Sequence, residues 1–334
     1  MKRVLLLATG GTIAYREGEH GLAPGLAAEG LLRHLPELRE HYLVDTRDIL
    51  DLDSSNIQAE EWQTIAHAVW QALGRYDGVV ITHGTDTMAY TASVLSYMLQ
   101  DLDRPVVLTG SQMPMGRLLS DARANLATAF SAVDLGLPGV MVAFDHRLIR
   151  GCRAVKVRTM AFEAFESVNA PYLAQVYADG LRPDPAALRP AAPGRSPRLA
   201  DRLCTDVFLL KLIPGTNPDI FDKLTELNVR GVVLETFGVG GLHFVRRNLL
   251  PKLEQLIGRG VSVVACSQCL YETSDFSLYE VGQRLLDCGV IPARDMTTEA
   301  AVTKLMWALG QTTDPQRVRE IFDTDYAGEV TLPG

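Results

Sequence analysis

Residues 4–14 read VLLLATGGTIA, an apolar run that passes directly into two glycines set between threonines. The same order returns twice, in GVVITHGTDTM at 78–88 and in PVVLTGSQMP at 105–114. Unbroken apolar runs of about four to eight residues, rich in Val, Leu and Ile, are typical of strands that are buried on both faces. These stretches therefore predict a parallel sheet whose strands end in short polar loops.

Longer amphipathic stretches separate these strands and predict helices over 59–76, 87–100 and 121–135. In the first of them Trp62, Ile65 and Val69 recur at intervals of three and four residues, which places them on one helical face. A further apolar run at 139–144 predicts a fourth strand. The alternation of buried strands with helices indicates an α/β fold with helices on both faces of the sheet.

A segment rich in Pro, Ala and Arg, residues 182–203, interrupts this alternation and is interpreted as a linker. Beyond it, strands are predicted at 207–212, 231–235 and 261–266, and helices at 218–227, 248–257 and 298–309. We therefore expect two doubly wound, mostly parallel α/β domains joined by the linker. Their expected bounds are 1–181 for the N-terminal domain, which carries the polar loops, and 204–334 for the C-terminal domain.

The composition excludes several classes of function. The chain of 334 residues has 32 Lys and Arg against 40 Asp and Glu, a formal net charge of −8. Proteins that neutralise phosphates are usually basic, so nucleic acid is not expected as a partner. The N-terminal apolar run is too short for a signal peptide or a membrane helix, so no membrane association is expected. Five cysteines, an odd and sparse set, favour a reduced cytoplasmic setting.

The motifs that would bind common cofactors are missing from the sequence. Gly10 and Gly11 do not extend to the G-x-G-x-x-G spacing of a dinucleotide site, and no phosphate-binding P-loop sequence occurs. Cys266 and Cys269 form a single C-x-x-C without a second pair for zinc, and the seven histidines show no metal-ligand spacing. We expect neither a cofactor nor a metal.

The polar loops after the first three strands should meet at one edge of the sheet, because ligands bind beyond the carboxyl ends of parallel strands. All three loops carry hydroxyl groups. A threonine hydroxyl is a weak nucleophile that needs a base or a neutral lysine nearby. The chain has six lysines against 26 arginines, and Lys156 follows the fourth strand closely enough to turn back toward these loops. The alternative interpretation is a solvated surface lysine.

Three of these features together resemble the bacterial-type L-asparaginases: ATGGTIA at 8–14, HGTDTM at 83–88 and Lys156. The resemblance extends over the whole chain. MAYTASVLSYML at 88–99 and DMTTEAAVTKL at 295–305 are similar to the cytoplasmic type I branch. The resemblance implies that the protein hydrolyses L-asparagine to L-aspartate and ammonia through an acyl-threonine intermediate, with the N-terminal domain as the catalytic domain.

The resemblance also assigns roles to individual residues. Thr12 would be the nucleophile that attacks the side-chain carboxamide, although which threonine attacks first stays open. Thr85, Asp86 and Lys156 would form a second cluster, in which the lysine lowers the effective pKa of the Thr85 hydroxyl and its water. Asp86 would also bind the α-ammonium group of the substrate. The loop of Asp53, Ser54 and Ser55 would bind its α-carboxylate, with the Ser54 hydroxyl as a donor.

One feature of the family is absent at its usual place. Many members carry a catalytic tyrosine after a glycine in the loop that follows the nucleophile, whereas this chain has Gly21, Leu22 and then Ala23-Pro24. Some type I members supply the tyrosine from the second domain in a Tyr-x-x-Gly run, and Tyr279 to Gly282 has that form. We therefore predict Tyr279 as the catalytic tyrosine, against an ordinary half-buried aromatic residue.

Three further expectations concern assembly and alternative functions. Family members bury the site partly at subunit contacts, so a homodimer or homotetramer is expected. The amidase component of a tRNA-dependent amidotransferase shares this core but carries an extra N-terminal domain, and the present sequence starts at the first strand. A non-catalytic amino-acid-binding sensor is the other alternative, although a sensor would not need all of Thr12, Thr85, Asp86 and Lys156.

Overall fold

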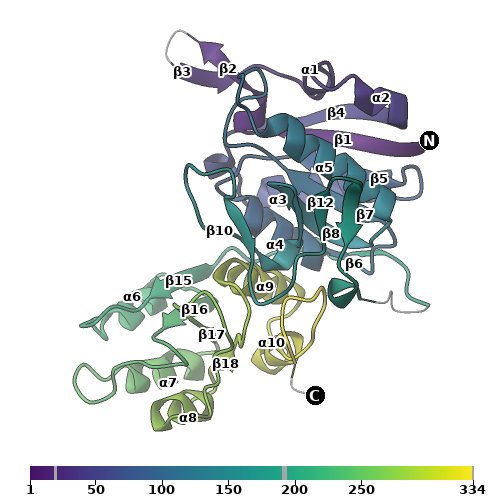
Figure 1. Ribbon diagram of the computed structural model, residues 1–334. Coiled ribbons are helices and arrows are strands. Elements are labelled where there is room, and N and C mark those ends of the chain that lie inside the picture. Colours follow the sequence, from purple (N-terminus) through teal and green to yellow (C-terminus); the bar gives the residue numbers. More distant parts are fainter. Residues whose placement is uncertain (19–20, 190–193, 333–334) are drawn as a thin grey trace. The chain divides into compact units, whose positions relative to one another are not determined.

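The computed structural model describes residues 1–18, 21–189 and 194–332. The chain divides into two compact units, Met1–Asp201 and Arg202–Gly334, which are described separately. The helices and strands of both units are drawn in Figure 1.

The first unit is built around an eight-stranded sheet. Its strand order is β13-β12-β9-β8-β7-β5-β1-β4, and the five strands from β8 to β4 are parallel. Strand bounds are β1 Lys2–Gly10, β4 Tyr42–Leu52, β5 Gly78–Thr82, β7 Pro105–Thr109, β8 Gly139–Phe144, β9 Arg147–Arg150, β12 Ala174–Tyr177 and β13 Gly180–Pro183. Two-stranded pairs add β2 Tyr15–Gly18 with β3 Gly21–Pro24, β10 Ala154–Lys156 with β11 Phe165–Ser167, and β6 Leu99–Gln100 with β14 Arg198–Leu199.

The three predicted helices of this unit are present, and two short helices, α1 and α2, were not predicted from the sequence. The helices are α1 Ala28–Leu32, α2 Glu37–His41, α3 Ala59–Ala72, α4 Met88–Met98 and α5 Ala122–Leu135, with 3-10 turns η1 Thr12–Ala14, η2 Ser54–Asn56, η3 Gly151–Arg153 and η4 Pro185–Ala187. Helix α3 begins with a reciprocal cap, in which the Glu61 carboxylate accepts from the Gln58 N–H at 2.9 Å. It ends earlier than predicted because Leu73 is extended and Gly74 has φ 81°.

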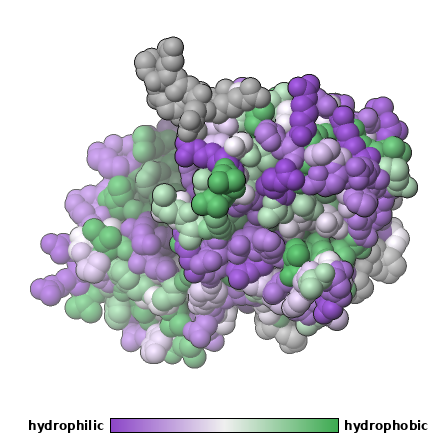
Figure 2. Space-filling model, turned by 45° about the horizontal axis from the view of Figure 1, so that its top comes forward, coloured by the Kyte–Doolittle hydropathy of each residue, from purple (hydrophilic) through white to green (hydrophobic). Residues whose placement is uncertain are grey.

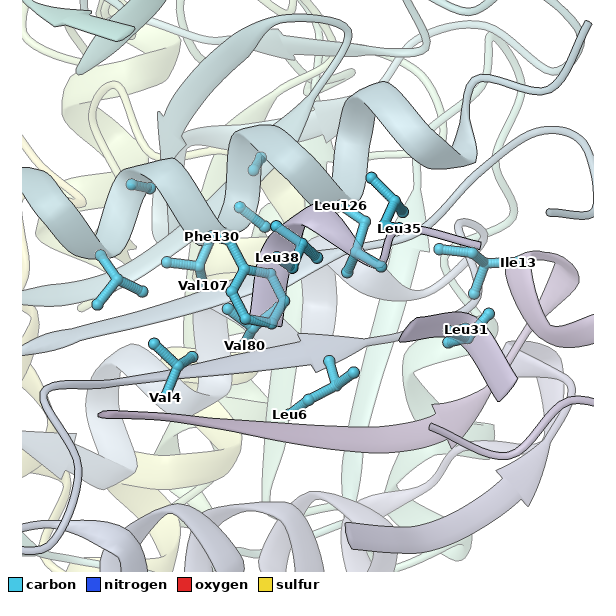
Figure 3. Close-up of a cluster of buried hydrophobic side chains, with 14 of the residues drawn as sticks. Val4, Leu6, Ile13, Leu31, Leu35, Leu38, Val80, Val107, Leu126 and Phe130 are labelled. Atoms are coloured by element: carbon cyan, nitrogen blue, oxygen red, sulfur yellow. The ribbon is translucent and has the colours of Figure 1, made fainter. Parts of the chain in front are cut away.

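The central strands are buried on both faces. Val4 and Leu6 of β1 point into a core with Leu126 and Phe130 of α5, whereas Leu5, equally buried, points to the opposite face. Figure 3 shows this core, in which Val80 and Val107 from the neighbouring strands join the same cluster. The strands predicted within 78–88 and 105–114 and at 139–144 are confirmed as β5, β7 and β8, because double-sided burial leaves an apolar run in the sequence.

Strand β4 was not predicted from the sequence. It forms the edge of the sheet, pairs only with β1, and exposes alternate residues such as Leu43, Asp45 and Arg47. Its partly buried and exposed residues alternate, so it has no continuous apolar run.

The segment 182–203, interpreted above as a linker, is mostly part of the first unit in the structure. Its first two residues, Arg182 and Pro183, belong to β13. Because β13 is an edge strand, the missing N–H of Pro183 removes no hydrogen bond between central strands. Farther along, Arg198 and Leu199 pair with β6, and the Ala200 N–H donates to the Met98 carbonyl at 2.8 Å. Pro190 and Pro193 lie outside the described residues. The boundary between the compact units follows Asp201.

The second unit contains a four-stranded parallel sheet of order β15-β16-β17-β18. Its elements are β15 Val207–Lys211, α6 Ile220–Glu226, β16 Gly231–Thr236, α7 Leu250–Gly258, β17 Ser262–Ser267, α8 Glu280–Asp287, β18 Ile291–Pro292, α9 Thr298–Gln311 and α10 Pro315–Phe322. The core includes Phe221, Leu234, Leu253 and Val263. Two mostly parallel sheets with intervening helices confirm the predicted α/β fold class.

The surface mixes polar and apolar side chains, as Figure 2 shows for one face. Leu118, Leu119 and Met160 of the first unit are among the most exposed large apolar residues, at 99%, 74% and 84% exposure. None of the described helices has the length and apolar content needed to span a bilayer.

Candidate active site

Four loops of the first unit lie side by side because their strands are neighbours in the sheet. The pairings Ala8 with Thr82, Thr82 with Thr109, and Gly10 with Leu52 bring the carboxyl ends of β1, β5, β7 and β4 to one edge. The strand order therefore brings the polar loops together at one edge of the sheet, as predicted.

The first two loops touch through their glycines. Gly11 has φ 81°, and a Cβ atom at this position would lie 2.4 Å from the Gly84 nitrogen and 2.5 Å from its Cα. Only glycine fits such an approach in this conformation. Thr12 and Thr85 each follow one of the touching glycines, so the backbone contact brings the two threonines into one site.

Thr12 is the first residue of the 3-10 turn η1. Its side chain is half-buried, and among the residues that the structure describes no hydrogen-bond partner exists for its hydroxyl. A hydroxyl without an internal partner is available to a ligand.

Thr85, Asp86 and Lys156 form a hydrogen-bonded cluster. The Lys156 Nζ donates to Thr85 Oγ1 at 2.8 Å and to Asp86 Oδ1 at 2.5 Å. Only 16% of the lysine side chain is exposed, whereas 65% of the aspartate side chain is. The cation is therefore held against the threonine hydroxyl, while the carboxylate also faces solvent.

The chain carries Lys156 to this place through a close contact with α4. In the turn η3, Gly151 packs so tightly that a Cβ there would lie 3.0 Å from the Ala92 carbonyl oxygen and from Ser96 Oγ. Strand β10 then leads from η3 to Lys156 and pairs with β11, with Lys156 opposite Phe165. Because Thr85 and Asp86 directly precede α4, this path ends beside them.

Gln112, in the loop after β7, bridges the cluster to a neighbouring segment. Its Oε1 accepts a long hydrogen bond from Thr85 Oγ1 at 3.4 Å, and its Nε2 donates to the Thr159 and Ala161 carbonyls at 3.1 Å. Gln112 was predicted to lie in a polar loop of the site but without a role, since the sequence does not show which side chains meet.

The loop of Asp53, Ser54 and Ser55 follows β4 and contacts the Thr85 loop. Ser54 is 3% exposed, and its Oγ accepts from the Asp86 N–H at 3.3 Å. The Thr87 hydroxyl donates to the Ser54 carbonyl at 2.7 Å. The Ser54 hydroxyl proton has no acceptor within the described part of the chain, so this group can donate to a ligand.

Asp53 and Ser55 make their hydrogen bonds within the protein. The Ser55 N–H and hydroxyl donate to Asp53 Oδ1 at 2.9 and 2.6 Å, and these bonds hold the pKa of the Asp53 carboxyl below its usual value. The Tyr15 hydroxyl donates to Asp53 Oδ2 at 3.2 Å. Burial, with the Asp53 charge as the second cause, raises the pKa of Tyr15. Asp53 therefore ties the loop of residues 53–55 to the turn after Thr12 through Tyr15, a contact of this tyrosine that was not predicted from the sequence.

Tyr279, predicted as the catalytic tyrosine, belongs to the second unit. It stands at the N-terminal cap of α8 with 64% of the residue exposed. Gly282 of the same run packs on backbone, because a Cβ there would lie 2.2 Å from the Phe276 carbonyl oxygen. Close packing therefore explains the glycine of the Tyr-x-x-Gly run without any catalytic role. The role of Tyr279 stays a prediction.

Two observations concern metal ligands and the cysteine of the predicted C-x-x-C run. In residues 1–18, 21–189 and 194–332 no group of three or more His, Cys, Asp or Glu is placed to hold a metal ion. Cys266 is buried, and burial raises its pKa to about 12, which disfavours the reactive thiolate.

Known proteins with the same architecture are similar over nearly the whole chain. Residues 3–186 match the family described as asparaginase, N-terminal, and residues 206–322 match the glutaminase/asparaginase C-terminal domain. An L-asparaginase of Thermococcus kodakarensis is 43% identical over 330 residues, covering 98% of this chain and 99% of the relative. The solved structure of the thermostable L-asparaginase from that organism has a TM-score of 0.93 at 43% identity, covering 99% of this chain and all of the other.

A second group of relatives has a different name. A glutamyl-tRNA(Gln) amidotransferase subunit of Pyrococcus abyssi is 36% identical over 344 residues, covering 99% of this chain and 77% of the relative. Over nearly its whole length the chain is similar to L-asparaginases, which are amidohydrolases, and the protein is an enzyme of this class. The chain belongs to the asparaginase family.

Proposed function

We propose that the protein hydrolyses L-asparagine to L-aspartate and ammonia through an acyl-enzyme on Thr12. The observation that carries the proposal is the hydrogen-bonded cluster of Lys156, Thr85 and Asp86, which lies beside a second threonine whose hydroxyl has no partner among the described residues. The similarity to L-asparaginases supports the same substrate.

In the first half-reaction the Thr12 oxygen attacks the side-chain carboxamide carbon of the substrate. The new C–O bond forms as the carbonyl electron pair moves to oxygen, and the pair returns as the C–N bond breaks. The hydroxyl proton of Thr12 passes to the nitrogen, which leaves as ammonia. The products are ammonia and an aspartyl ester on Thr12.

The developing oxyanion needs hydrogen-bond donors. The Thr85 N–H has no acceptor among the residues that the structure describes, although Thr85 is only 7% exposed. A buried backbone N–H without an acceptor is uncommon and is suited to bind a ligand oxygen. We therefore assign the Thr85 N–H to the carbonyl oxygen under attack.

In the second half-reaction water attacks the ester carbon, the bond to Thr12 Oγ breaks, and one water proton restores the hydroxyl. The Lys156 cation, 2.8 Å from Thr85 Oγ1, stabilises negative charge on this oxygen or on a water bound to it. Lys156 and Thr85 thus make the proton of the water easier to remove.

The remaining groups hold the ends of the zwitterionic substrate. Asp86 uses Oδ1 for Lys156, and its Oδ2 has no partner within the described residues, so this oxygen is assigned to the α-ammonium. The Ser54 hydroxyl is assigned to the α-carboxylate. Asp53 and Ser55 shape the loop that presents Ser54.

The deciding experiment measures ammonia and aspartate after the purified protein is mixed with L-asparagine alone. We expect both products in equal amounts. The similarity to the amidotransferase protein of Pyrococcus abyssi favours a second candidate, the amidase of a tRNA-dependent amidotransferase. Release of ammonia only with a second amidotransferase protein and charged tRNA would support that candidate, whereas asparagine binding without any release would indicate a sensor.

We further propose that the chain assembles as a homodimer or homotetramer in the cytoplasm. The exposed Leu118 and Met160 side chains support burial of part of the first unit against another molecule, and the five free cysteines suit a reducing compartment. Light scattering at micromolar concentration should give two or four times the 36.5 kDa mass of one chain. A fully active monomer would contradict this prediction.

A further inference from the structure

A buried chain of hydrogen bonds runs from helix α3 to the loop that carries Thr85. Trp62 Nε1 of α3 donates to Thr91 Oγ1 of α4 at 2.9 Å. Thr91 Oγ1 is 2.9 Å from His83 Nε2, and His83 Nδ1 is 2.7 Å from the Gly84 carbonyl oxygen. His83 and Thr91 are fully buried, and Trp62 is 7% exposed.

The partners of His83 determine which of its nitrogens carries the proton. A carbonyl oxygen can only accept, so Nδ1 must be the donor to Gly84. Burial lowers the pKa of His83 to about 4, so the ring is neutral at neutral pH and Nε2 is an acceptor. The Thr91 hydroxyl then donates to Nε2 and accepts from Trp62. In this row of hydrogen bonds Trp62 donates to Thr91, Thr91 to His83, and His83 to the Gly84 carbonyl, so each donor has an acceptor.

These hydrogen bonds fix the orientation of the peptide bond between Gly84 and Thr85. The peptide is trans, and the C=O and N–H of a trans peptide point to opposite sides. Because the Gly84 carbonyl points to the buried ring, the Thr85 N–H points away from it. This is the N–H that has no acceptor among the described residues.

Neighbouring loops hold the same peptide from other sides. The His83 N–H donates to the Thr109 carbonyl at 2.8 Å, which fixes the residue on β7. Ser54 Oγ would lie 2.6 Å from a Cβ on Gly84, so its side chain packs directly on this glycine. These contacts fix where the peptide lies, whereas the bond from His83 fixes which way its carbonyl faces.

We propose that His83, together with Thr91 and Trp62, is a positioning device that orients the Gly84–Thr85 peptide so that the Thr85 N–H meets the oxyanion of the reaction. The inference rests on the proposed function. None of the three side chains is assigned to touch the substrate. Because the oxyanion forms only in the transition state, loss of the device reduces kcat and leaves KM nearly unchanged.

The test replaces Thr91 with valine, which has nearly the same shape and lacks the hydroxyl. We expect kcat for asparagine to fall about tenfold, while KM stays within about twofold. This loss in kcat is smaller than the roughly hundredfold that a displacement of about 1 Å costs. Thr91→Ser keeps the hydroxyl and should restore most of the activity. The matched control is Thr128→Val on α5, another buried threonine, whose hydroxyl donates to the Ala124 carbonyl at 2.8 Å.

The outcomes separate this inference from the proposed function. If the unmodified protein hydrolyses asparagine and Thr91→Val retains its kcat, or if Thr128→Val loses as much, the positioning role is wrong. If the unmodified protein releases no ammonia, the proposed function fails first. In either case nitrogen-15 NMR of His83 provides an independent result: a proton on Nδ1 at neutral pH supports the hydrogen-bond chain, and a proton on Nε2 overturns it.

Discussion

Replacement of Thr12 with alanine is expected to lower kcat for asparagine hydrolysis by about three to four orders of magnitude. This loss corresponds to about 4–5.5 kcal/mol of transition-state stabilisation. The covalent step needs an oxygen nucleophile at this place, and an alanine methyl group cannot supply one. The Thr12 hydroxyl has no hydrogen-bond partner among the described residues, so its removal breaks no internal bond and the fold should remain intact.

The control for this prediction is Thr12→Ser, which keeps a hydroxyl and should retain far more activity than the alanine variant. Thermal unfolding of both variants should match that of the unmodified protein, which would separate lost chemistry from lost structure. A Thr12→Ala protein with a tenth of the original rate would show that another group is the nucleophile. Mass spectrometry of protein quenched during turnover should find the acyl group on a peptide that contains Thr12.

The sequence predicts the buried part of the fold well for a physical reason. Strands β5, β7 and β8 are covered on both faces, so most of their positions carry apolar side chains and the run is visible without structure. Strand β4 has one exposed face and an edge, and it was missed. The proline-rich segment at 182–203 looks like a linker locally, but its pairing with β6 and β12 depends on distant residues.

The candidate site divides in the same way. Thr12, Thr85 and Asp86 follow strand ends directly, so the strand order alone is enough to bring them to one edge. Lys156 reaches them from a distant segment through the packing of η3 on α4, and it was predicted from the rarity of lysine, its position after the fourth strand and the family resemblance. The partners of Tyr15, Gln112 and His83 are set by side-chain geometry, which a single sequence does not contain.

The Lys156→Met variant is expected to lose about two to three orders of magnitude in kcat, while KM changes no more than a few-fold. Methionine has a similar length but no charge, so the variant removes the donor that lies 2.8 Å from Thr85 Oγ1 and keeps most of the packing. The lysine side chain is only 16% exposed, so solvent cannot easily replace the cation. The loss belongs to kcat because negative charge near Thr85 develops during the reaction and is absent from the bound substrate.

Asp86→Asn is the comparison variant, because its effects on kcat and KM should differ from those of Lys156→Met. Asp86 holds Lys156 through Oδ1 and is assigned to the substrate ammonium through Oδ2, so its loss should lower kcat and raise KM together. Steady-state rates over a wide range of asparagine concentration separate the two effects for each variant. A Lys156→Met protein changed in KM alone would show that the lysine acts only in substrate binding. A group that stabilised charge in the transition state would instead lower kcat when it is removed.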